Sequence, residues 1–217
     1  MNILKRFIGM LISVSILGLG IALILKASIG ASPYDALSQT VSEISTIKVG
    51  TVTIIINSIF IMIQILLKGK NFPIIQYLQF IVIFLLGNVV NIFLYNILNF
   101  EISNYLIKSF IYICGTLVSA LGIAGIVNIN IVYTALEGFL VAITEKTKSN
   151  FVKNRLYYDI ICVILAIALA FIFKVDLQIR EGTIISAFIF APIMGYFMRI
   201  TKPLFKKLGI LDPAINN

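Results

Sequence analysis

The sequence predicts an all-α, polytopic membrane protein whose six transmembrane helices form two inverted repeats of three helices each. The class follows from composition, because 60% of the 217 residues are hydrophobic and only 12% are charged, which excludes an ordinary soluble domain. The repeat follows from a tetrapeptide near the end of an apolar run, since Leu19-Gly20-Ile21-Ala22 recurs 102 residues later as Leu121-Gly122-Ile123-Ala124. The same offset places Asp35 opposite Glu137 and Asn57 opposite Asp159.

Six apolar runs reach or approach the length of about 20 residues that a helix needs to cross a bilayer. They cover residues 7–25, 49–67, 74–98, 105–127, 156–173 and 183–198. We expect a single membrane domain over residues 1–217, with repeat 1 at 7–98, repeat 2 at 105–200 and a basic cytoplasmic tail at 201–217. Because each repeat has an odd number of spans, the two cross the membrane in opposite directions. Many secondary transporters are built this way, with their sites near the midplane where the repeats meet.

The distribution of charge predicts the orientation. If the N-terminus is cytoplasmic, twelve of the seventeen lysines and arginines fall on the cytoplasmic side, so the positive-inside rule predicts a multi-pass protein of the cell membrane with both termini cytoplasmic. The net charge of +8 then indicates anionic lipids on that side as neighbours, and not nucleic acid.

A segment too short to cross the bilayer separates the first and second spans of each repeat. In repeat 1, Gly30 ends the preceding helix, Ser32 is a good N-cap, Pro33 suits the first helical position and Asp35 can return a capping bond. These signals predict a helix from residue 33 to about residue 44, roughly 18 Å long, which is about half a bilayer.

The second copy of this segment uses different residues. Asn128 and Asn130 are the expected helix breakers, and Thr134 precedes Glu137 with the spacing of a capping box. Two placements stay open for the short helices: on the membrane surface, or re-entrant from opposite sides. The re-entrant placement is favoured because the short helices have little polar face for headgroups. Irregular backbone at membrane depth must be buried or line a cavity, so the breaks would then mark a cavity.

One of these segments carries a family resemblance. Gly30-Ala31-Ser32-Pro33-Tyr34-Asp35-Ala36-Leu37, with Val49-Gly50-Thr51-Val52 and the later Gly182-Thr183-Ile184-Ile185, resembles the bacterial YczE/YyaS/YitT family of integral membrane proteins over about residues 19–196. The resemblance implies a six-span membrane protein regarded as a transporter. The second copy keeps the acid, as Glu137, but has Ala135 where such proteins usually have proline.

Asp35 and Glu137 are the strongest candidates for a ligand site, because an ionisable residue inside a membrane needs a partner or water. Each can instead be only a cap on its own helix. Asn88 and Asn91 share a face of the third span, where they either bond to neighbouring helices or line a substrate path with Asn57. The predicted pathway comprises Ser32, Pro33, Tyr34, Asp35, Asn57, Asn88, Asn91, Asn128, Asn130, Tyr133, Thr134 and Glu137.

Two functions of different classes fit these features. The first is a small-molecule transporter or permease, coupled to protons or cations, that acts on a polar or zwitterionic substrate. The second is a non-enzymatic substrate-binding or scaffold subunit that works with an energising or biosynthetic protein partner. We expect no enzyme, cofactor or metal site, because the chain has no histidine and its two cysteines lack a basic partner in the sequence.

Overall fold

The computed structural model describes residues 3–211, and all of its regular structure is helical. Five segments are long and apolar enough to cross a membrane: Ile3–Ala27, Val49–Asn71, Ile74–Ile97, Tyr105–Ile129 and Phe151–Phe173. The sixth expected run lies within a further long helix, α8 (Glu181–Leu208). The protein is therefore a multi-pass helical membrane protein, as its composition predicts.

The same order of elements occurs twice along the chain. A helix of 25 residues, α1 (Ile3–Ala27), is followed by a helix of 13, α2 (Pro33–Ser45), and then by a long helix, α3 (Val49–Lys68). The second half repeats the pattern with α5 (Tyr105–Ile129, 25 residues), α6 (Ala135–Thr147, 13 residues) and α7 (Phe151–Phe173). The order agrees with a duplicated unit, while the inverted relation of the two halves stays a prediction.

The last segment of each half differs in regularity. In the first half, a 3-10 turn (Ile74–Leu78) leads into α4 (Gln79–Asn91), which continues as a π-helical stretch (Ile92–Ile97). In the second half, α8 runs unbroken for 28 residues past Pro192 and Pro203. It therefore extends into the segment expected as a basic tail, of which residues 212–217 lie outside the described part of the chain.

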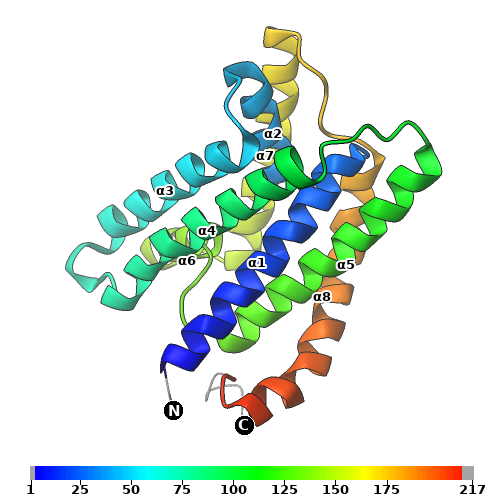
Figure 1. The fold of residues 1–217 in the computed structure, drawn as a ribbon. Coiled ribbons are helices and arrows are strands. Elements are labelled where there is room, and N and C mark those ends of the chain that lie inside the picture. The colour runs from blue at the N-terminus through cyan, green and yellow to red at the C-terminus, as the bar shows by residue number, and fades with distance from the viewer. Residues whose placement is uncertain (1–2, 212–217) are drawn as a thin grey trace.

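The repeated tetrapeptides meet at the contact between α1 and α5, which run side by side in Figure 1. A Cβ at Gly20 would lie 2.4 Å from the Ser119 backbone nitrogen, and a Cβ at Gly122 would lie 2.5 Å from the Leu17 nitrogen. Each copy thus supplies the glycine that lets the partner helix approach, as is common where membrane helices pack closely.

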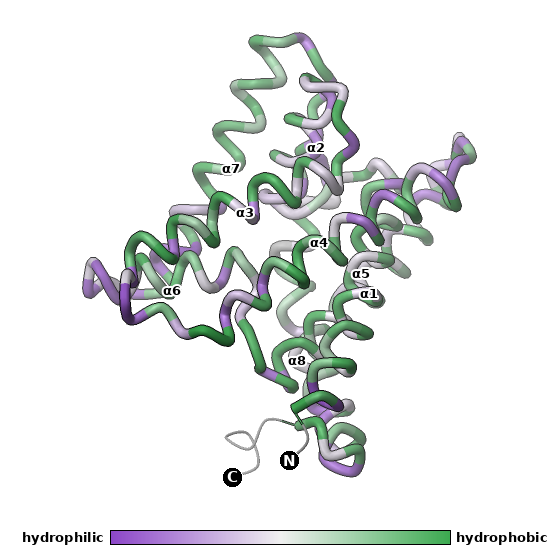
Figure 2. Tube along the Cα trace, turned by 60° about the vertical axis from the view of Figure 1, so that its left-hand side comes forward, coloured by the Kyte–Doolittle hydropathy of each residue, from purple (hydrophilic) through white to green (hydrophobic). Residues whose placement is uncertain are grey.

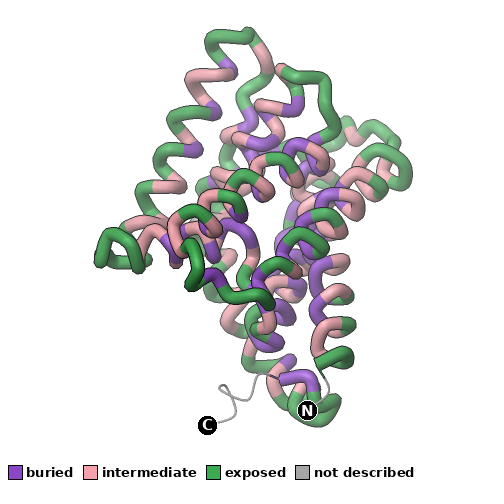
Figure 3. Tube along the Cα trace, turned by 90° about the vertical axis from the view of Figure 1, so that its left-hand side faces the viewer, coloured by how far each residue is buried: buried purple, intermediate pink, exposed green. Residues whose placement is uncertain are grey.

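The two short helices each lie against a long helix of the other half. α2 packs on α7 and α6 packs on α3, while each also contacts the long helix that follows it in sequence. Polar residues concentrate at the helix ends and connecting segments in Figure 2, and the long helices are mostly apolar. In Figure 3 the outer turns of α7 are largely exposed, and its buried residues, Cys162, Ala166 and Ala170, form one narrow stripe. The rest of the α7 surface is therefore suited to contact lipid.

Candidate functional site

Both short helices begin after a backbone break that a distant arginine holds in place. Before α2, Gly30 has a φ of 134°, which favours glycine, and Arg180 Nη1 donates to the Ser28 carbonyl over 2.8 Å. Before α6, Asn130 has a φ of 45°. The Arg6 guanidinium donates to the backbone carbonyl of the residue that precedes Asn130. The two breaks that the sequence predicts are thus held by arginines from other parts of the chain.

The predicted N-caps are confirmed, with one correction. Ser32 Oγ accepts a bond from the Asp35 amide over 3.2 Å and donates to Asp35 Oδ2 over 2.6 Å, and Pro33 is the first residue of α2. Thr134 Oγ1 accepts from the Glu137 amide over 3.4 Å. However, the Glu137 carboxylate turns toward α7 and bonds there, so the reciprocal half of the expected capping box is not formed.

One arginine of α7 pairs with an acid of α6 and with an acid of its own helix. Arg155 Nη1 lies 3.2 Å from Glu137 Oε1 of α6, and Arg155 Nε lies 3.2 Å from Asp159 Oδ2, one helical turn further along α7. Asp35 of α2 also interacts electrostatically with this guanidinium. We call these four residues the acid cluster. Two carboxylates thus pair directly with one guanidinium, and the Asp35 carboxylate lies within the electrostatic reach of the same charge.

Four aromatic rings pack together beside the acid cluster. The ring of Phe60, on α3, stacks on Phe139 at 4.8 Å between centroids, and lies 5.9 Å from Tyr158 and 6.3 Å from Tyr34. Each of its three partners is within two residues of an acid of the cluster: Tyr34 precedes Asp35, Phe139 follows Glu137 and Tyr158 precedes Asp159. The rings therefore form an aromatic wall that joins α3 to α2, α6 and α7, the three helices that carry the acids.

Several polar atoms in this region are buried and have no hydrogen-bond partner among the described residues. They are Glu137 Oε2, Asp159 Oδ1, the Tyr34 hydroxyl and the Ser38 hydroxyl. Buried polar groups are usually satisfied, and exceptions often mark binding sites. The carboxylates of Glu137 and Asp159 each give one oxygen to Arg155 and leave the other available, so the acid cluster retains capacity to accept hydrogen bonds.

The asparagines of the second and third spans lie in three different environments. Asn91 Oδ1 accepts from the Gly50 amide over 2.9 Å, and its Nδ2 donates to the hydroxyl of the next residue in α3, so Asn91 joins α4 to α3. Asn88 is half-buried and donates to the Phe84 carbonyl of its own helix, so the two do not share one polar stripe. Asn57 is buried within α3, at 5% exposure.

The residues around the second break also separate. Asn128 lies inside α5 and donates to two groups of α8 over 2.9 Å, so its predicted role as a helix breaker is wrong. Asn130 does end the helix, in the left-handed conformation. The Tyr133 amide donates to Gln76 Oε1 over 3.1 Å, which ties the start of α6 to the segment before α4.

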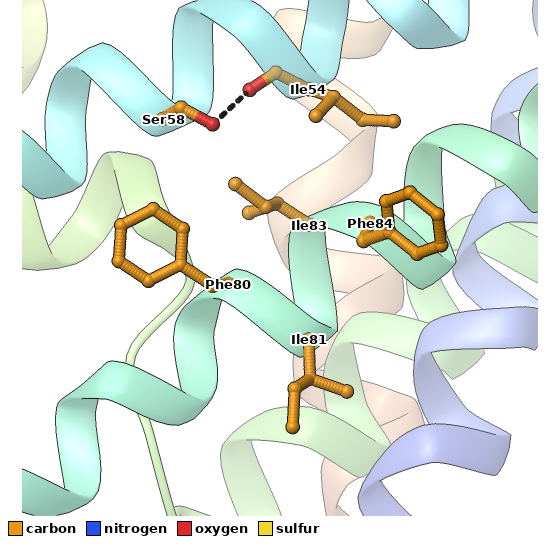
Figure 4. Close-up of a pocket in the computed structure, with 6 residues that line it drawn as sticks. All are labelled: Ile54, Ser58, Phe80, Ile81, Ile83 and Phe84. Carbon is orange, nitrogen blue, oxygen red and sulfur yellow. Dashed lines mark hydrogen bonds between the residues drawn. The ribbon is translucent and has the colours of Figure 1, made fainter.

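A groove between α3 and α4 lies apart from the acid cluster (Figure 4). Its volume is about 440 Å³, and it is lined by Ile54, Ser58, Phe80, Ile81, Ile83 and Phe84. The Ser58 hydroxyl is already bonded to the Ile54 carbonyl over 2.8 Å, so the groove offers little to a polar ligand. The groove has an almost entirely apolar lining and is suited to contact lipid. The acid cluster is therefore the stronger candidate for a site that binds a polar ligand.

Sequence reasoning identifies both acids of the short helices but misses the arginine that pairs with Glu137. The spacing of Arg155 and Asp159 predicts a local ion pair at i and i+4, which the structure confirms, yet Arg155 also pairs with Glu137. Phe60, Phe139 and Tyr158 gave no signal, because aromatic residues within apolar runs do not differ in pattern from core residues. Asp159 matches Asn57 of the first half at the repeat spacing, and this match was the available hint that Asp159 belongs to a site and not only to a local ion pair.

Comparison with known proteins agrees with the resemblance seen in the motifs. The chain is 27% identical over 192 residues to the uncharacterized protein YyaS of Bacillus subtilis (strain 168), an alignment that covers 88% of this chain and 91% of the relative. No solved structure matches the chain. A family model, described as a family of unknown function (DUF6198), matches residues 4–199. The chain therefore belongs to the DUF6198 family.

Proposed function

We propose that the protein is a membrane transporter or permease for small polar molecules, and that the acid cluster is its ligand site. The observation that carries the proposal is the ion pair of Glu137, on the short helix of the second half, with Arg155 of a long helix. Asp35, on the equivalent short helix of the first half, lies within the electrostatic reach of the same guanidinium. A binding site at the meeting point of two inverted repeats is the arrangement that secondary transporters use.

The inverted repeat and the re-entrant helices are part of this proposal. The exchange of contacts, α2 with α7 and α6 with α3, is the pattern expected when two similar units are related by a two-fold axis. Ser38, Thr40 and Ser42 of α2 are buried, which supports a helix surrounded by protein and not one lying on headgroups. With both termini cytoplasmic, α2 and α6 would enter the bilayer from opposite sides.

The charge of the acid cluster supports coupling to protons or cations. Three carboxylates and one guanidinium leave an excess of negative charge when all are ionised, and charge inside a membrane is costly without compensation. A proton or a cation that arrives and leaves with the substrate would provide that compensation. No step in this proposal makes or breaks a covalent bond, so the activity proposed is binding and movement and not catalysis.

Reconstitution tests the proposal directly. Liposomes containing only this protein are loaded with a polar metabolite extract, and the compounds released are identified by mass spectrometry. We expect selective release from the unmodified protein and its loss in Arg155→Gln, because removal of the guanidinium leaves Glu137 and Asp159 unpaired. Lys146→Gln is the matched control, since this exposed lysine of α6 lies outside the acid cluster.

The result can also decide against transport. A compound retained by the purified protein but never released from liposomes would indicate a binding subunit that needs a partner. Release that is equal in Arg155→Gln and in the unmodified protein, at equal amounts of folded protein, would place the site away from the acid cluster.

A further inference from the structure

The unpartnered atoms of the acid cluster define the kind of ligand that it can take. Arg155 engages one oxygen of Glu137 and one of Asp159, and the second oxygens, Oε2 and Oδ1, are buried without a hydrogen-bond partner among the described residues. An ionised carboxylate oxygen only accepts hydrogen bonds. The group that completes these two carboxylates must therefore carry N–H or O–H donors.

A second observation, independent of the acids, lies on the neighbouring helix. Ser38 of α2 is fully buried, at 0% exposure, and its hydroxyl has no partner among the described residues. The Tyr34 hydroxyl, one helical turn earlier on the same face, is likewise buried without a partner. It also interacts electrostatically with Cys162 of α7, which lies about one helical turn after Asp159, so it faces the part of α7 that carries the acid cluster. Polar atoms without partners thus continue from the acids along the α2–α7 contact.

The balance of charge selects a cation among the possible donors. Glu137 and Asp159 outnumber Arg155 by two to one, so an added positive charge is attracted and a negative one is repelled. A bound metal ion is disfavoured, because within residues 3–211 no group of three or more carboxylates and cysteines is arranged to hold one. An ammonium group needs no such arrangement, since it can bond to separate oxygens through separate N–H groups.

The aromatic wall supplies the remaining element of recognition. Phe60 joins the rings of Tyr34, Phe139 and Tyr158 into one apolar surface, and these three rings flank the acids in sequence. Aromatic faces favour both apolar groups and nearby cations. A ligand with an ammonium group attached to an apolar or aromatic body would use the carboxylates and the rings together.

We propose that the acid cluster binds organic amines, with Glu137 Oε2 and Asp159 Oδ1 accepting N–H bonds from the ammonium group and the aromatic wall contacting the carbon body. The role of such amines as transported substrates rests on the proposed function. Their binding does not, and it can be measured on the purified protein.

Isothermal titration calorimetry in detergent with three probes tests this inference. Phenethylammonium carries both the charge and the N–H donors, phenethyltrimethylammonium keeps the charge without the donors, and 2-phenylethanol lacks the charge. We expect phenethylammonium to bind at least about tenfold more tightly than either of the others. Binding should fall by about tenfold or more in Glu137→Gln and in Asp159→Asn, because each removes one charged acceptor.

Glu145→Gln is the matched control, since Glu145 is an acid of the same helix, α6, that pairs with Lys68 outside the acid cluster. It should bind phenethylammonium unchanged. Absence of binding, equal binding of 2-phenylethanol, or undiminished binding in both acid variants, each with folding verified by gel filtration, would overturn the inference. Amine binding without any flux through liposomes would overturn transport alone, and flux of other compounds without amine binding would overturn the amine site alone.

Discussion

At the scale of single residues, Asp35 and Glu137 share a capping position but not an environment. The Asp35 carboxylate accepts from the hydroxyl of its own N-cap, whereas Glu137 reaches across to Arg155. The sequence predicted both as acids in the first turn of a short helix, and it predicted their caps. It did not predict the different partners, because the arginine belongs to another helix, and local spacing carries no information on how separate helices pack.

Charge at these two acids is therefore predicted to affect binding more than folding. Asp35→Asn and Glu137→Gln keep the shape and the polarity of each side chain, and Glu137→Gln leaves Arg155 paired with Asp159. We expect each variant to be produced at near-normal levels while ligand binding or flux falls by about tenfold or more. Normal flux in both variants would make the acids structural and would move the site elsewhere.

Buried amides form a second feature at this scale. Gln64, Gln79 and Gln76 lie in one buried chain of hydrogen bonds, with 3.1 Å between Gln64 Nε2 and Gln79 Oε1 and 2.7 Å between Gln79 Nε2 and Gln76 Oε1. Gln64 also donates to the Ala135 carbonyl at the start of α6 over 3.0 Å. This chain anchors the short helix to α3 and to the segment before α4.

Removal of the central amide should consequently destabilise the protein. Gln64→Met removes the bond to the Ala135 carbonyl and leaves part of the buried Gln79 amide unpaired, at a cost of about 1–3 kcal/mol, and we expect a lower midpoint in thermal unfolding followed by circular dichroism. Asn88→Leu is the control, because Asn88 is not buried and bonds only within its own helix among the contacts described. Equal midpoints for Gln64→Met and the unmodified protein would contradict a structural role for this chain.

At the scale of elements, close glycine contacts determine which helices can pack. Gly50 and Gly87 face each other where α3 meets α4, and a Cβ on Gly87 would lie 2.4 Å from the Gly50 carbonyl oxygen. The backbone cannot yield as a flexible side chain can. The apolar runs predicted both helices, but periodicity did not show that they meet at these two glycines, because small residues serve several packing surfaces in membrane helices.

Gly87→Ala should therefore loosen the contact between α3 and α4. Overpacking of this kind costs about 1–3 kcal/mol, measured as a fall in the thermal midpoint. Gly195→Ala in α8 is the matched control, because no atom lies within 4 Å of a Cβ built there, and alanine is the better helix former. A Gly87→Ala midpoint at or above that of Gly195→Ala would show that the two backbones do not approach this closely in the membrane.

At the scale of the whole molecule, the two halves resemble each other in order but not in every contact. α4 packs against both α1 and α3, whereas α8 makes its extensive contacts with α5. The sequence predicted the duplication from a tetrapeptide and from matched acids. It could not predict this asymmetry, because the connection after α7 (residues 175–180) has no regular secondary structure and sets no fixed distance between α7 and the start of α8.

The orientation of the halves is the remaining prediction, and it rests on charge. Twelve of seventeen cations lie on one side in a six-span arrangement, so the positive-inside rule places both ends of the chain in the cytoplasm.

In a background without Cys114 and Cys162, a single cysteine at Lys70 or Lys206 should react with a membrane-impermeant maleimide only after the cells are opened. A cysteine at Ser103, in the connection before α5, should react in intact cells. All three positions lie in or beside connecting segments or helix ends, so their reactivity reports the side of the membrane and not burial. Labelling of Lys70 and Ser103 from the same side would mean that the segment Ile74–Ile97 does not cross, and two inverted units of three spans would then be impossible.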